Sequence, residues 1–182
     1  GRPGPAVGTA TATSTPPTVL AADSFGRPVT GGWGSADTGG AWTTNSGGSN
    51  FAVNGTTRSI RMATAGSGPS IFLNGVSATS TDVQLTATTD KAPTGGGIYV
   101  SLVGRRVAGA GDYRAKVRLL SNGQVNLALV RTSSTGAETT IRAEAAVAGL
   151  AYTPGTPLRI RLQVTGTNPT TVHAKVWAAT SA

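Results

Sequence analysis

Apolar and polar residues alternate in short runs through the second half of the chain. Val83, Leu85 and Ala87 alternate with polar neighbours, and the same pattern returns at residues 98–102 and 113–119. A period of two places every second side chain on one face of an extended strand. Each run therefore predicts a β-strand that buries one face.

Turn signals separate these runs from further strands. The Asn122-Gly123 pair lies between two alternating runs and predicts a hairpin whose primed turn gives both residues a positive φ, with residues 125–129 pairing back antiparallel. Later runs follow Gly-, Ser- or Pro-containing turns, at residues 138–147, 158–164 and 172–176. Strands at this spacing predict an antiparallel β-sandwich, and the lack of crossover helices argues against a parallel α/β fold.

The first half of the chain is less regular. Weak strands separated by Gly-rich loops are expected around residues 19–25, 41–44, 50–53, 59–63 and 70–73. No stretch shows helical periodicity, so we expect an all-β fold with little or no helix. Residues 1–18, rich in Pro, Gly and Thr, predict a linker, and residues 19–182 are expected to form a single domain.

Composition narrows the classes of partner. The net charge of +8, from 15 basic and 7 acidic residues, favours anionic partners. The chain has no cysteine, so disulfides and thiolate chemistry are excluded. No apolar window is long enough to cross a bilayer, so we expect no membrane insertion. Residues 1–5 lack the features of a signal peptide, and we expect the chain to be processed or excised from a longer protein.

Several strings of residues resemble one known family. They are 23–27 (DSFGR), 31–34 (GGWG), 37–42 (DTGGAW), 51–55 (FAVNG), 95–106 (GGGIYVSLVGRR), 113–119 (YRAKVRL) and 170–177 (TTVHAKVW). Over about residues 20–178 the chain resembles a concanavalin A-like, laminin G-like jelly-roll domain of actinobacterial surface proteins and actinophage minor tail proteins. The resemblance implies a secreted or cell-surface location, or alternatively a virion tail. It also implies a final strand that is missing here, disordered or supplied by a neighbour.

Catalytic patterns are weak. Glucanases of the family that the chain resembles use two or three carboxylates spaced along one strand, and the acidic residues here are scattered. His173 is the only histidine and has no nucleophile motif around it. We therefore expect no enzyme, and a glycan hydrolase would need a distant pair such as Asp37 with Asp112.

Two acidic and two aromatic residues in the Gly-rich region are candidate ligands. Asp23 and Asp37 offer hard oxygen atoms to a structural calcium ion, which related folds often hold. Trp33 is a candidate platform for a sugar ring, and Trp42 is expected to be buried at the end of the core instead.

Five cations share the outward phase of two predicted strands: Arg114, Lys116, Arg118, Arg159 and Arg161. If those strands are neighbours, the cations form a basic plate for uronates, teichoic acid or another anionic cell-wall polymer. The alternative is an ordinary solvated sheet face. His173 and Lys175 share the same phase.

Three functions remain open. The first is a non-catalytic extracellular or virion-surface module that recognises a surface polysaccharide. The second is a structural or assembly domain of a phage tail or surface filament that self-associates through an edge strand. The third is a glycan hydrolase-like domain. Nucleic-acid binding is disfavoured, because aromatic residues are only 5% of the chain and no recognition helix is predicted.

Overall fold

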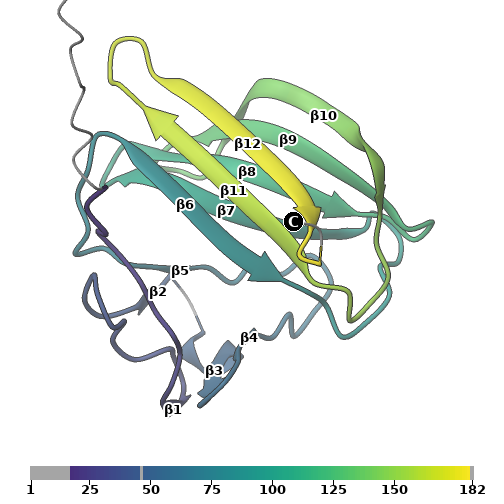
Figure 1. Ribbon diagram of the computed structural model, residues 1–182, viewed down its shortest axis with the longest axis horizontal. Helices are drawn as coiled ribbons and strands as arrows, with labels where there is room; N and C mark the ends of the chain where they lie inside the picture. The colour runs from purple at the N-terminus through teal and green to yellow at the C-terminus, as the bar shows by residue number, and fades with distance from the viewer. Residues whose placement is uncertain (1–16, 46, 181–182) are drawn as a thin grey trace, which may run out of the picture. The chain divides into compact units, whose positions relative to one another are not determined.

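β-strands make up nearly all of the regular structure in the computed structural model, which describes residues 17–45 and 47–180 (Figure 1). Within those ranges the only helical segment is a 3-10 turn, η1 (Gly48–Asn50), and no helix has the length and apolar character needed to span a membrane. Every strand pair is antiparallel. The predicted all-β, antiparallel fold class is therefore confirmed.

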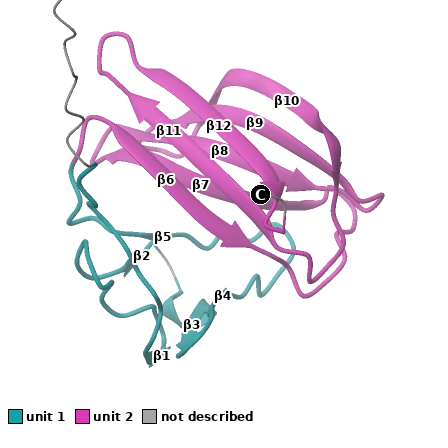
Figure 2. Cartoon of the chain, viewed as in Figure 1, with its two compact units in different colours: residues 1–77 teal, residues 78–182 magenta. Residues whose placement is uncertain are grey.

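The chain divides into two compact units, residues 1–77 and residues 78–182 (Figure 2). The predicted linker at residues 1–18 lies, apart from its last two residues, outside the described residues. The assignment of residues 19–182 to one domain stays a prediction.

Unit 2 is a sandwich of two antiparallel sheets, which Figure 1 shows as two layers. The sheets have the strand orders β10-β9-β8-β7 and β12-β11-β6. The strands are β6 (Thr81–Ala87), β7 (Ile98–Val107), β8 (Gly111–Leu119), β9 (Gln124–Thr132), β10 (Glu138–Ala151), β11 (Leu158–Thr165) and β12 (Thr171–Ala178). This order shows a β-sandwich, and the jelly-roll connectivity implied by the resemblance stays a prediction.

The core of unit 2 lies between the two sheets and comes from the alternation seen in the sequence. Val117 of β8, Val125 of β9 and Leu162 of β11 are almost fully buried in one apolar cluster. Gly104 permits the sheets to approach, because a Cβ there would lie 2.8 Å from a methyl carbon of Leu162. Burial of this apolar surface at about 25 cal/mol per Å² is the main term that stabilises the sandwich.

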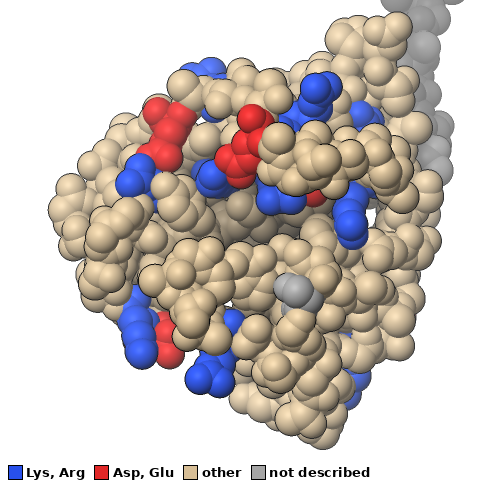
Figure 3. Space-filling view, turned by 180° about the vertical axis from the view of Figure 1, so that it is seen from behind, with Lys and Arg blue, Asp and Glu red and all other residues tan. Residues whose placement is uncertain are grey.

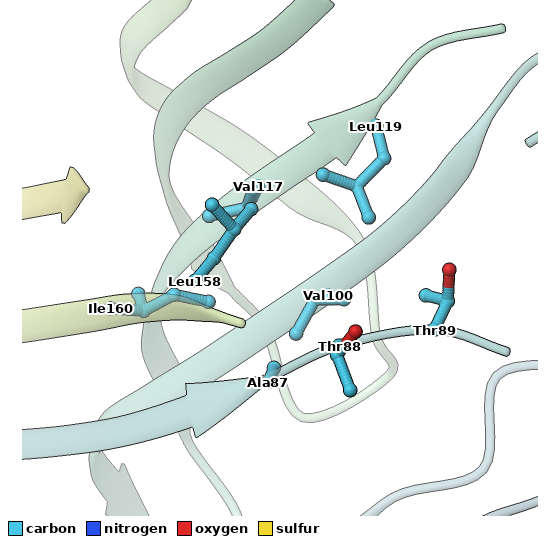
Figure 4. Close-up of a pocket in the computed structure, with 8 residues that line it drawn as sticks. All are labelled: Ala87, Thr88, Thr89, Val100, Val117, Leu119, Leu158 and Ile160. Carbon is cyan, nitrogen blue, oxygen red and sulfur yellow. The ribbon is translucent and has the colours of Figure 1, made fainter. Parts of the chain in front are cut away.

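A small gap lies in this core. Figure 4 shows its lining, which comes from both sheets and is formed by Ala87, Thr88, Thr89, Val100, Val117, Leu119, Leu158 and Ile160. Its volume is about 10 Å³, at the lower limit for one water molecule, and a water also needs polar partners. The gap is a packing defect and not a ligand site.

The predicted hairpin between β8 and β9 is confirmed, with Leu119 opposite Val125. The predicted primed turn is wrong, because Gly123 has a φ of 83° and Asn122 is not among the residues with positive φ. The N–H of Gly123 donates to the carbonyl of Leu120 at 3.0 Å. This geometry is a type I turn followed by a glycine in the left-handed region, which is the usual longer hairpin loop.

Unit 1 contains short strands. A three-stranded sheet has the order β1-β3-β4 and a second sheet pairs β2 with β5. The strands are β1 (Pro28–Thr30), β2 (Thr43–Thr44), β3 (Phe51–Asn54), β4 (Arg58–Ile60) and β5 (Ile71–Phe72). The predicted strand at residues 19–25 is wrong, since that segment forms only an isolated bridge from Ala22 to Thr38 and then a loop held by side-chain hydrogen bonds. β1 was not predicted.

Candidate functional site

The outer face of the sheet β12-β11-β6 carries a shallow hollow of about 330 Å³. Its lining residues are Gln84, Arg161, Gln163, His173, Ala174, Lys175 and Trp177. We name these residues, together with Asp82 and Arg159, the Trp177 face. The volume is near the lower end of the range for small-ligand sites, about 300–1,000 Å³.

Strand alternation places the polar side chains of this face. In β11 the buried residues Leu158, Ile160, Leu162 and Val164 point into the core, so Arg159, Arg161 and Gln163 point outward. Asp82 and Gln84 do the same on β6, and His173, Lys175 and Trp177 do so on β12.

The pairing register aligns these residues into three rows across the sheet. Along β12, Trp177 is opposite Arg159, Lys175 is opposite Arg161, and His173 is opposite Gln163. Along β6, Gln84 is opposite Arg161 and Asp82 is opposite Gln163. Directly opposite side chains on one face lie about 5 Å apart, so the face presents a continuous array of hydrogen-bonding groups beside one indole ring.

The only carboxylate of the Trp177 face is occupied by its neighbours. Arg161 donates from Nε to Oδ1 of Asp82 at 2.8 Å and also pairs with Oδ2, and Gln163 donates to Oδ2 at 3.0 Å. The hydrogen bond from Arg161 is the main cause of the lowered pKa of Asp82. Asp82 therefore stays ionised and neutralises Arg161.

Two cations of the same face lack such compensation. Within the described part of the chain, neither Arg159 nor Lys175 has a carboxylate partner. The Lys175 ammonium lies 5.1 Å from the centroid of the Trp177 ring, within cation–π range. The surroundings of Trp177 are therefore positively charged.

The other three predicted cations lie elsewhere in the sandwich. Arg114, Lys116 and Arg118 are on β8, which belongs to the four-stranded sheet, while Arg159 and Arg161 are on β11 of the other sheet. The single basic plate is therefore wrong. The physical reason is that the consecutive strands β7 to β10 form one sheet as a meander, and the chain then crosses to the other sheet, where β11 pairs with β6 and β12.

The cations of β8 are each paired with a carboxylate. Arg114 pairs with Asp112 at 2.6 Å, Lys116 with Glu138 at 2.7 Å, and Arg118 with Glu144 at 3.2 Å. We name the Tyr99 face as Tyr99, Arg114, Lys116, Arg118, Glu138 and Glu144. In the view from behind, Figure 3 shows basic and acidic side chains next to one another. This arrangement matches the solvated sheet face that was the alternative interpretation.

An aromatic ring is also present on the Tyr99 face. Tyr99 is 45% exposed, with the Lys116 ammonium 4.9 Å and the Arg118 guanidinium 5.4 Å from its ring centroid. Glu144 accepts a hydrogen bond from Asn126 at 2.7 Å, the main cause of its lowered pKa. The two faces thus have similar residue types and differ in how their charges are compensated.

The two predicted calcium ligands are engaged within unit 1. The Asp23 side chain is 3% exposed, and Arg27 donates to both of its oxygens, at 2.8 and 2.7 Å. Trp42 Nε1 and the backbone N–H of Phe25 add bonds of 2.7 and 2.9 Å. Arg27 is the first cause of a pKa lowered to about 2.

Asp37 accepts a hydrogen bond from the backbone N–H of Ser24 at 2.7 Å, and hydrogen bonding to Ser24 is the main cause of its lowered pKa. Among the described residues no group of three or more acidic or histidine side chains is placed to hold a metal. Four N–H groups already donate hydrogen bonds to the Asp23 carboxylate, so these side chains do not fit a calcium ion. Calcium has no part in the function proposed below.

Trp33 lies in the aromatic core of unit 1 and offers no free ring face. It is 8% exposed and makes edge-on contacts with Phe25, Trp42 and Phe51 at centroid distances of 5.4, 5.0 and 6.1 Å. Its Nε1 donates to the carbonyl of Ser59 at 3.2 Å. Edge-on packing of this kind stabilises a core, so Trp33 is placed as a structural residue.

Asp82 and Glu144, the carboxylates of the two outer sheet faces that hold several hydrogen bonds, do not have the properties of a glycosidase acid. Such a group needs a raised pKa so that it is protonated when it meets the leaving group. The pKa values of Asp82 and Glu144 are both lowered. Neither side chain is therefore suited to donate a proton at neutral pH.

Searches against protein family models, curated proteins and solved structures find no match to this chain. The interpretation of the site therefore depends on its own geometry.

Proposed function

We propose that the chain is a non-catalytic extracellular or virion-surface module that binds a surface polysaccharide through the Trp177 face. The observation that carries this proposal is the hollow whose lining includes Trp177 together with Gln84, Gln163 and His173. An indole can stack on a sugar ring, and the amide, imidazole and cationic groups can bond to its hydroxyls. The resemblance to a concanavalin A-like domain supports the same class of function.

Trp177→Ala tests this proposal. Loss of the stacking surface is expected to weaken binding about tenfold or more, while the variant stays folded because Trp177 is only partly buried. Affinity electrophoresis through gels that contain different polysaccharides would measure binding and rank the polymers in one experiment.

Tyr99→Ala is the matched control, since it removes an exposed aromatic ring from the opposite sheet. It is expected to bind as the unchanged chain does. Equal loss in both variants, or no loss in Trp177→Ala, would exclude the Trp177 face as the binding surface.

A second candidate function is assembly through an edge strand. β12 is the end strand of its sheet and pairs with β11 over eight residues without a register shift, whereas the pairing of β10 in the other sheet is interrupted by three shifts. Regular edges can pair with another chain, and bulged edges resist this. Light scattering over a range of concentrations would reveal self-association, and self-association without polysaccharide binding would favour this function.

A further inference from the structure

We infer that the polysaccharide is acidic, with carboxylates on its sugar rings, and that Arg159 and Lys175 select for that charge beside Trp177. This inference rests on the proposed function, because it names the ligand class of the same face. The first observation is the charge of the face, where three cations accompany one carboxylate. Asp82 is paired with Arg161 and does not compensate the other two cations. Arg159 and Lys175 are therefore available to a ligand.

The position of these two cations is the second observation. Arg159 is directly opposite Trp177 in the pairing of β11 with β12, and Lys175 lies two residues before Trp177 on the same face. The indole ring therefore has a guanidinium across the strand pair and an ammonium along its own strand. A sugar stacked on the ring would present its substituents to both groups.

The ammonium over the ring discriminates between neutral and acidic sugars. Lys175 Nζ lies 5.1 Å from the ring centroid, so a neutral sugar that stacks there displaces the ammonium and offers it only uncharged hydroxyl groups. A uronate stacks in the same way and pairs its carboxylate with the displaced ammonium. The planar guanidinium of Arg159 can hold a second carboxylate through two parallel hydrogen bonds.

The Tyr99 face supplies the contrast within the same unit. Lys116 and Arg118 also lie near an aromatic ring, but Glu138 and Glu144 already satisfy them. An acidic ligand there would compete with bonds that exist in the free protein. Charge removal on that face is therefore a control with the same change in net charge.

The experiment compares binding of the full chain to five polymers of similar length. They are alginate (uronate), dextran (neutral), carboxymethyl-dextran, dextran sulfate and polyglutamate. Alginate and carboxymethyl-dextran are expected to bind about tenfold or more tighter than dextran, since each polymer offers carboxylates to both cations. Binding should weaken with added salt but persist, because stacking on Trp177 is not screened.

Two double variants test the assignment. Arg159→Ala with Lys175→Ala is expected to remove the preference for carboxylated over neutral polymer, and Lys116→Ala with Arg118→Ala is expected to keep it. Circular dichroism and thermal unfolding of both variants check that the sandwich is intact.

Each contrary outcome has one meaning. Equal binding of alginate and dextran by the unchanged chain overturns the inference and leaves the polysaccharide function standing. Polyglutamate binding as tightly as alginate overturns it in favour of a charge effect without sugar recognition. Dextran sulfate binding more tightly than carboxymethyl-dextran overturns the choice of carboxylate. Failure of every glycan to bind removes the proposed function itself.

Discussion

The two outer faces of unit 2 are built from the same strand pattern and differ in their charge balance. Both carry Arg and Lys beside one aromatic ring, Trp177 on one face and Tyr99 on the other. On the Tyr99 face each of the three cations has a carboxylate partner, whereas on the Trp177 face only Arg161 has one. The difference shows that net charge and alternation do not reveal which cations are compensated by a neighbouring carboxylate and which are not.

Both faces lie over the same apolar core, and a cavity in that core is expected to have the largest effect on the stability of unit 2. Leu162 is 0% exposed and belongs to the strand that carries Arg161 on its other side. Leu162→Ala leaves a cavity and is expected to destabilise unit 2 by about 2–5 kcal/mol. Hydrogen exchange measured by mass spectrometry should show lost protection in both sheets. Loss confined to β6, β11 and β12 would mean that the faces do not share a core.

The ion pair between Arg27 and the buried Asp23 carboxylate in unit 1 shows what a partly buried ion pair contributes to stability. The pKa of Asp23 is lowered from 3.8 to about 2, so the stabilisation is present above pH 3.8 and is lost as the pH falls through the folded value. A shift of this size corresponds to about 2 kcal/mol. Asp23→Asn is expected to lose about that much stability near neutral pH.

The measurement is chemical unfolding followed by intrinsic tryptophan fluorescence, to which Trp33 and Trp42 of unit 1 contribute, near pH 7 and again below the folded pKa of Asp23. The difference between the variant and the unchanged chain should shrink at the acidic pH, because Asp23 is then protonated in both the folded and the unfolded state. A loss of equal size at the two pH values would show that the amide disturbs packing and that the charge is not responsible.

Much of the fold could be predicted from the sequence, because the strands of unit 2 have a local signal. Alternation located β6 and β11 closely, since every second side chain of each is apolar and faces one core. Alternation carries no information on which strands pair. β11 joins β6 across a long stretch of chain, and the supposed plate of Arg114 with Arg159 was wrong for that reason.

The candidate site was predicted only in part. Arg159 and Arg161 were assigned correctly to an outward phase, but Trp177 was noticed only within a resemblance and Gln84 and Gln163 were not singled out. A local signal did exist for Trp177, since it shares the phase of His173 and Lys175. The burial of Trp33 had no local signal, because it depends on aromatic residues gathered from separate loops of unit 1.

The smallest expected effect comes from making the Tyr99 face resemble the Trp177 face. Glu138→Gln with Glu144→Gln removes the partners of Lys116 and Arg118 and keeps the side-chain shapes. Because these pairs are partly exposed, the stability change is expected to be under about 1 kcal/mol. Binding of carboxymethyl-dextran should strengthen a few-fold, about what uncompensated surface charges contribute, and this gain should vanish at high salt.

The gain should also be insensitive to Trp177→Ala, since it arises on the opposite sheet. If the new binding requires Trp177, the double variant has strengthened binding at the Trp177 face by raising the net charge, and the two faces are not independent. If no binding is gained, exposure of cations beside an aromatic ring is insufficient, and the hollow of the Trp177 face is the feature that matters.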